Sequence, residues 1–202
     1  MLLVLTMTIL QRVASALAPL SQRATRPSWD DAVLGAYPSG SLETLFAERL
    51  TLAHGVLCRT WGDVAARLAA ERCTVGYCDP TLRRLLPPGF DQAFQIETAF
   101  DRARIDDYTF GITRATAAIA ETGTLVLSDH ETSRRLGALA PWVHVAVVQR
   151  ETLRATLADM LTAMPHDPNV IWVTGPSKTA DVEGILIEGV HGPGVQIALL
   201  LD

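Results

Sequence analysis

The chain has 202 residues, which suits one domain, or one domain with a small appendage. Hydrophobic residues make up 49% and charged residues 19%, so there is enough apolar material for a core and disorder is excluded as the main state. The net charge of −5 gives no basic face for nucleic acid, because phosphate contacts need clustered Lys and Arg.

The first ten residues, MLLVLTMTIL, are apolar but too short to cross a membrane, which takes about twenty residues. No positive charge precedes them, so they do not resemble a secretory signal. Because Met7 offers a second possible start, we interpret residues 1–6 as an over-called start or a frayed extension. An amphipathic helix is predicted over residues 9–20. We expect a cytoplasmic protein without membrane contact.

A polar stretch at residues 21–28 is predicted to be a linker. It divides the chain into an N-terminal helix and linker, residues 1–28, and an α/β domain, residues 29–202. Ser41 is predicted to cap a helix that runs to about residue 53. The other elements predicted in the first half are strands at 55–59, 73–78 and 93–96, a helix at 63–71 and a helical turn at 80–86.

The second half shows clearer patterns. Its predicted elements are strands at 117–120 and 124–128, buried strands at 143–148 and 170–174, a helix at 152–164, and final strands at 185–190 and 195–201. Since strands alternate with helices, the pattern predicts an α/β fold with a mostly parallel sheet flanked by helices. Right-handed crossovers would place functional loops at the carboxyl ends of the strands.

The chain has three cysteines, Cys58, Cys73 and Cys78, which exclude a disulfide scaffold and a four-thiolate cluster held by this chain alone. We interpret them as buried small hydrophobic side chains, with a cluster or metal shared with another protein as the alternative. His144 lies inside an apolar strand and is predicted to be in the core. No histidine spacing indicates zinc, so no metal site is predicted.

The first candidate motif is Glu121-Thr122-Gly123, which interrupts two apolar runs. A carboxylate at the end of a buried strand is partly desolvated, which raises its pKa and would let Glu121 act as a nucleophile or base. The alternative is a hairpin turn in which Gly123 takes a positive φ and Glu121 is solvated or caps the backbone. The spacing by itself favours the turn.

The second motif, GPSKTADVE at residues 175–183, follows a predicted strand. It is interpreted as an anion-binding loop that opens a short helix at Thr179 or Ala180. Lys178, the only lysine in the chain, either binds a ligand carboxylate or pairs with Asp181. The predicted ligand-binding residues of this motif are Gly175, Ser177, Lys178, Thr179 and Asp181.

The third motif is the turn Gly192-Pro193-Gly194 with His191 at its mouth. A lone histidine is more often structural than catalytic, but this one stands beside two candidate loops. His191 and Gly192 therefore join the predicted site.

Three stretches together carry a family resemblance: GITRATAAIAETGTLVL, RRLGALAPWVHVAVV and GPSKTADVEGILIEGVHGP. In this order they resemble the LUD-domain (lactate-utilisation) family, and they are closest to its small single-domain members. The resemblance covers about residues 109–201. It implies a fold similar to the phosphosugar-isomerase and CoA-transferase-like α/β superfamily.

The resemblance also implies a function, that of an accessory, substrate-binding subunit in a system that oxidises L-lactate to pyruvate. Its partners would be iron–sulfur subunits, with clusters expected only in them and no cofactor in this chain. A small carboxylate would bind near Ser177, Lys178, Thr179 and the backbone of Gly123 and Thr124. Two alternatives stay open: an acyl- or CoA-transferase-like enzyme with Glu121 as nucleophile, and a non-catalytic interaction module.

Overall fold

The computed structural model describes residues 8–19, 40–128, 135–164, 169–180 and 183–202. The chain divides into two units, Met1–Ala36 and Tyr37–Asp202, which are described separately. The predicted domain boundary at residues 28 and 29 lies outside the described residues.

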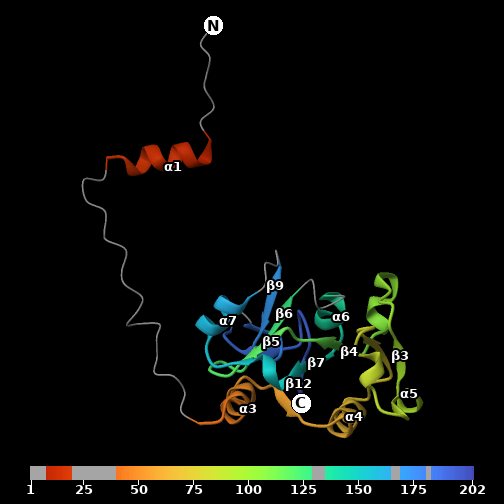
Figure 1. The fold of residues 1–202 in the computed structure, drawn as a ribbon. Coiled ribbons are helices and arrows are strands. Elements are labelled where there is room, and N and C mark those ends of the chain that lie inside the picture. Colours follow the sequence, from red (N-terminus) through yellow and green to blue (C-terminus); the bar gives the residue numbers. More distant parts are fainter. Residues whose placement is uncertain (1–7, 20–39, 129–134, 165–168, 181–182) are drawn as a thin grey trace. The chain divides into compact units, whose positions relative to one another are not determined.

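The described part of the first unit is the helix α1, Ile9–Leu17 (Figure 1). Thr8 and Gln11 form a capping box at its start, in which each side chain accepts a hydrogen bond from the other's backbone N–H. The helix ends before the predicted residue 20, because Pro19 has no N–H to continue the helical hydrogen bonds. Its apolar side chains Ile9, Leu10, Val13 and Leu17 are exposed among the described residues of this unit.

The main sheet of the second unit has the strand order β1-β12-β7-β4-β2-β3. Each pair of neighbours in it is parallel, which confirms the predicted mostly parallel sheet. The long central strands β7 and β12 are buried almost throughout, as their continuous apolar sequences predict. The strand bounds are β1 Val56–Cys58, β2 Val75–Cys78, β3 Gln95–Glu97, β4 Phe110–Arg114, β7 Val143–Gln149 and β12 Val195–Leu201.

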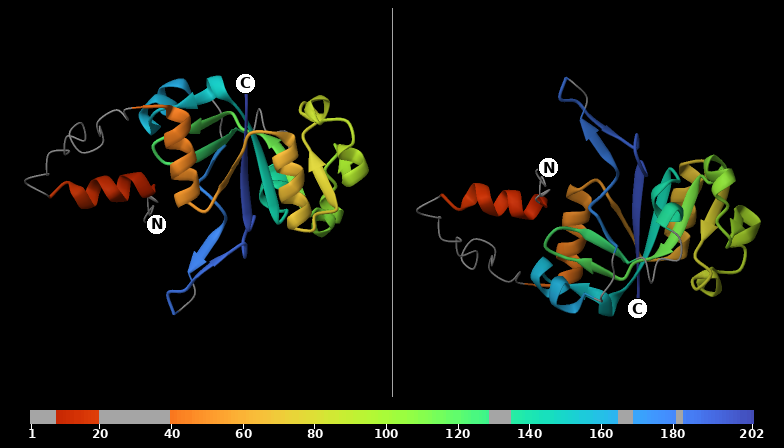
Figure 2. Two further views of the ribbon diagram at one scale, coloured as in Figure 1. Left: turned by 90° about the horizontal axis from the view of Figure 1, so that it is seen from below. Right: turned by 90° about the horizontal axis from the view of Figure 1, so that it is seen from above.

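Helices cover both faces of this sheet because side chains alternate along each strand. Val145 and Val147 of β7 pack with α4 (Trp61–Ala70), whereas Ala146 and Val148 pack with α3 (Leu42–Leu52). Figures 1 and 2 show α3 and α4 on either side of β12. Ser41 caps α3 as predicted.

A second sheet has the strand order β8-β5-β6-β9. Together with α3, it covers the face of the main sheet that carries Ala146 and Val148. β5 (Ala117–Ile119), β6 (Thr124–Ser128) and β9 (Val170–Val173) are antiparallel neighbours, and β8 (Leu153–Arg154) pairs with β5 in parallel. The prediction that residues 170–174 form a fully buried strand is wrong. β9 lies at the edge of its sheet, and one of its faces is exposed at Trp172.

Shorter elements complete the second unit. They are the helices α5 (Phe90–Ala93), α6 (Arg135–Leu139) and α7 (Leu157–Ala163), and the 3₁₀ turns Arg83–Leu85, Arg102–Asp107 and Arg150–Thr152. α7 begins later than the predicted residue 152, because Leu153–Arg154 first pairs with β5 and Thr156 then caps the helix.

The predicted short helix at Thr179 or Ala180 is wrong. That segment is the strand β10, Lys178–Ala180, which pairs with β11, Leu186–Glu188, in an antiparallel hairpin. The β-branched Thr179 lies opposite Ile187, a pairing that favours extended backbone. Figure 2 shows this hairpin projecting from the rest of the second unit.

Candidate functional site

A cavity of about 230 Å³ lies beside the amino-terminal ends of β7 and β12 and the carboxyl end of β9. We name it the His144 cavity. This candidate site thus lies at the carboxyl end of β9, as predicted for functional loops, but at the amino-terminal ends of β7 and β12. The polar residues among those that line it are His144, Thr174, Ser177, His191 and Gln196, joined by Gly175, Gly192 and the apolar Ala138 and Leu139 of α6.

The floor of the cavity is formed by the buried polar residues His144 and Gln196, and the polar row continues behind it to Thr113. The Gln196 side-chain amide donates to the Ile197 carbonyl oxygen at 3.1 Å, so its oxygen, 2.8 Å from His144 Nδ1, must accept. His144 is then protonated at Nδ1, and its Nε2 accepts a hydrogen bond from the Thr113 hydroxyl at 2.8 Å. Burial lowers the pKa of His144 to about 4, so the ring is neutral at physiological pH.

Two backbone hydrogen bonds hold the rim of the cavity. Ser177 N–H donates to the Pro193 oxygen, and Gly189 N–H donates to the Ser177 oxygen, each at 2.9 Å. A Cβ at Gly192 would lie 3.2 Å from Ser177 Oγ, so glycine at this position leaves room for the hydroxyl group. Gly175, Ser177, His191 and Gly192 were predicted from two separate motifs, and the structure brings them together around this cavity.

Glu121 lies elsewhere, at the turn between β5 and β6. Its carboxylate accepts a hydrogen bond from Leu157 N–H at 2.5 Å and so caps the start of α7. Gly123 has a φ of 68°, so this segment is the hairpin turn that the spacing favoured. Glu121 is not among the described residues that line the His144 cavity, and its role as a nucleophile stays a prediction.

Lys178 is also absent from the described residues that line the cavity. Its Nζ donates to the Ala53 carbonyl oxygen at 2.9 Å, at the carboxyl end of α3. Nζ also lies 3.7 Å from Glu188 Oε1, which His54 Nδ1 approaches at 2.7 Å. Lys178 thus ties the base of the hairpin to α3, while Asp181, its predicted alternative partner, lies outside the described residues.

Two of the predicted site glycines pack against α3. Gly123 and Gly175 both have positive φ angles. A Cβ at Gly123 would come within 2.3 Å of the Leu50 nitrogen, and one at Gly175 within 2.0 Å of the Ala53 oxygen. Both positions therefore require glycine for close packing, whatever else they do.

The prediction that the cysteines are buried is confirmed. Burial raises the pKa of Cys58 and Cys73 to about 11 and that of Cys78 to about 12, so all three are thiols at neutral pH. In the described ranges, no three His, Cys, Asp or Glu side chains lie close enough together to hold a metal ion. The described helices are too short or too polar to cross a membrane.

Sequence reasoning placed His144 in the core but missed its part in a cavity with Gln196. A signal for it exists in the sequence. Each residue is the second of its strand and is polar within an otherwise apolar run, and the two are register partners. Burying such groups is costly unless they bond one another, so a matched polar pair in neighbouring strands indicates a polar site.

The chain is similar to curated proteins named Lactate utilization protein C. It is 37% identical over 98 residues to that of Anoxybacillus flavithermus, which covers 47% of this chain and 42% of the relative. The identity is 33% over 103 residues with the Deinococcus radiodurans protein, covering 48% of each chain. It is 40% over 100 residues with the Macrococcus caseolyticus protein, covering 46% and 43%. The matches thus span less than half the length of these relatives.

The fold is similar to the crystal structure of a DUF162 family protein from Deinococcus radiodurans. The TM-score is 0.59 at 20% sequence identity, and the match covers 80% of this chain and 96% of the other. The LUD domain family matches residues 64–201, a range that holds most of the main sheet and all of the described residues lining the His144 cavity. The chain therefore belongs to the LUD domain family.

Proposed function

We propose that this protein is a small-carboxylate-binding subunit of a lactate utilisation system. The observation that carries the proposal is the convergence of Ser177, His191 and the buried His144 on one cavity. The names of the relatives support lactate utilisation as the process.

The cavity suits a small acid in size and chemistry. Its volume of about 230 Å³ is below the range of about 300–1,000 Å³ typical for drug-sized ligands. The Ser177 hydroxyl and the His191 ring both line the cavity and can bond the oxygens of a small acid. Such an arrangement fits a 2-hydroxy or 2-oxo acid, with L-lactate and pyruvate as the first candidates.

Titration calorimetry with L-lactate and pyruvate tests this proposal. A hydrogen bond to a charged group contributes about 1.5–3 kcal/mol, so we expect Ser177→Ala and His191→Gln each to weaken binding by about tenfold to a hundredfold. Thr179→Ala is the matched control, because Thr179 belongs to the hairpin and is not among the described cavity residues. Equal binding by all these variants, or no binding by the unmodified protein, contradicts the proposal.

We further propose that this subunit works with iron–sulfur partner subunits, which would carry the electrons of lactate oxidation. This proposal draws on the family resemblance and on the projecting β10–β11 hairpin, which exposes Ile185, Leu186, Ile187 and Val190. Neighbouring apolar side chains on one projecting element are typical of a protein-binding surface. The hairpin is therefore the surface where we expect a partner to bind.

A further inference from the structure

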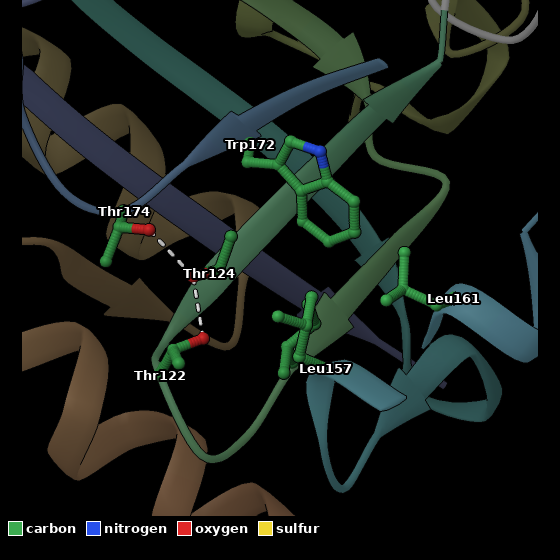
Figure 3. Close-up of a pocket in the computed structure, with 7 residues that line it drawn as sticks. Thr122, Thr124, Leu157, Leu161, Trp172 and Thr174 are labelled. Atoms are coloured by element: carbon green, nitrogen blue, oxygen red, sulfur yellow. Dashed lines mark hydrogen bonds between the residues drawn. The ribbon is translucent and has the colours of Figure 1, made fainter. Parts of the chain in front are cut away.

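A second hollow, of about 450 Å³, lies on the second sheet beside α7 (Figure 3). Leu157 and Leu161 of α7 form one wall and Trp172 of β9 the other, and Ile119 of β5 also lines the hollow. We name it the Trp172 groove. Two residues of the groove, Trp172 and Thr174, also line the His144 cavity. The other residues that line the groove do not line that cavity, so the groove is a separate site.

The walls of the groove are apolar and open to solvent. The exposed fractions are 42% for Leu157, 54% for Leu161 and 37% for Trp172. α7 has seven residues and covers only part of this sheet face, around Met160. An apolar body placed between the two leucines and the indole ring would remove this surface from water.

One end of the groove is polar. Thr124 Oγ1 lies 2.7 Å from both Thr122 Oγ1 and Thr174 Oγ1, which makes a row of hydroxyl groups (Figure 3). The row has three donor protons, and the hydrogen bonds within it use two. One O–H at an end of the row can therefore donate to a ligand oxygen.

The charge of the side chains that line the groove determines which ligands it can bind. Among the described residues that line it, none has a charged side chain. The carboxylate of Glu121 accepts a hydrogen bond from the backbone of Leu157, one of the residues that line the groove. An anion would lose its hydration here without meeting a cation among the described lining residues, whereas a neutral carbonyl oxygen would need only the one O–H donor.

We propose that the Trp172 groove binds an uncharged small molecule made of a straight apolar chain and a carbonyl oxygen. The chain lies between the two leucines and Trp172, and the carbonyl oxygen accepts the free O–H of the threonine row. This site adds to the proposed lactate function and does not depend on it.

An NMR titration with 2-alkanones from pentanone to nonanone tests the proposal. The reporter is the indole N–H signal of Trp172, assigned with Trp172→Phe among the four tryptophans of the chain. Each added CH₂ should tighten binding about fourfold until the groove is filled. Nonanoate should bind at least tenfold more weakly than 2-nonanone.

Variants separate the apolar body from the polar end. Leu161→Gln should weaken 2-nonanone binding at least tenfold, whereas Leu52→Gln, at a leucine of α3 that is 70% exposed, should change nothing. The double variant T122V/T174V should weaken every ketone by a similar factor and leave the dependence on chain length unchanged.

Four results would overturn the proposal: no shift of the Trp172 signal, affinity independent of chain length, equal binding of nonanoate, or equal binding by Leu161→Gln. A dimer that Leu161→Gln dissociates would instead assign the groove to a second copy of the chain. Ketone binding and lactate binding are measured separately, so either can fail without the other.

Discussion

His144 makes the stability of the fold depend on pH. Its ring is buried, neutral and bonded on both nitrogens, so protonation would disrupt the cavity floor. Burial lowers its pKa from 6.5 to about 4 in the folded protein. Between these values the unfolded chain binds more protons, so the free energy of unfolding falls as the pH drops from about 6.5 to about 4. Above pH 6.5 His144 makes its full contribution to the free energy of unfolding.

We expect His144→Gln to remove this dependence, since glutamine does not titrate. Urea unfolding at pH 7.5 and pH 4.5 should show that the unmodified protein loses roughly 3 kcal/mol more than the variant. All other titrating groups are common to the two proteins, so the difference isolates His144. Parallel pH curves would show that the ring is not held neutral by burial.

At the scale of elements, α3 positions two loops that pack against it, one at Gly123 and one at Gly175. At both glycines there is no room for a side chain. Gly175→Ala would set a Cβ 2.0 Å from the Ala53 oxygen at a φ of 77°. Gly184→Ala is the matched control, because Gly184 has a φ of 78° and no atom of the described residues lies within 4 Å of its Cβ position. The two substitutions share backbone strain and differ in the clash.

We expect Gly184→Ala to cost about 1 kcal/mol and Gly175→Ala about 3 kcal/mol or more. For a chain of this length, thermal unfolding should then show Tm falls of about 2–4 °C and about 6–12 °C. Equal falls would mean that the loop moves away from α3 at no cost, and that α3 does not fix the cavity rim.

The sequence predicted the two long central strands of the main sheet. The apolar runs at 143–148 and 195–201 became β7 and β12, and their character required a parallel sheet with both faces covered. The segment at Thr179 and Ala180 was misread as the start of a helix because β10 has only three residues and no apolar alternation. β4 was not predicted, since Gly111 hides its pattern; a Cβ there would lie 1.7 Å from the Gly137 oxygen of α6.

For the whole molecule, local motifs found several residues that line one cavity, but they did not show which side chains lie close together. Ser177 and His191 were found as loop residues beside a turn, and the backbone bonds between their loops place them on one cavity. Lys178 and Glu121 were chosen for their chemistry, yet each bonds to a nearby helix terminus. These hydrogen bonds join residues far apart in the sequence. They depend on how α3 and α7 pack, which the spacing of residues within a motif does not reveal.

The projecting hairpin gives the whole molecule a surface for assembly, which leads to a final expectation. Leu186 is 68% exposed there, and burying such a side chain contributes about 1.5–3 kcal/mol. Leu186→Asp should therefore reduce co-purification of iron–sulfur subunits at native expression by about tenfold to a hundredfold, measured as iron recovered per mole of tagged chain. Leu52→Asp, at a similarly exposed leucine of α3, should have no effect, and both variants should keep the unmodified Tm. Recovery of equal iron with Leu186→Asp would exclude the hairpin as the binding surface, and absence of iron from the unmodified protein would contradict the iron–sulfur partnership itself.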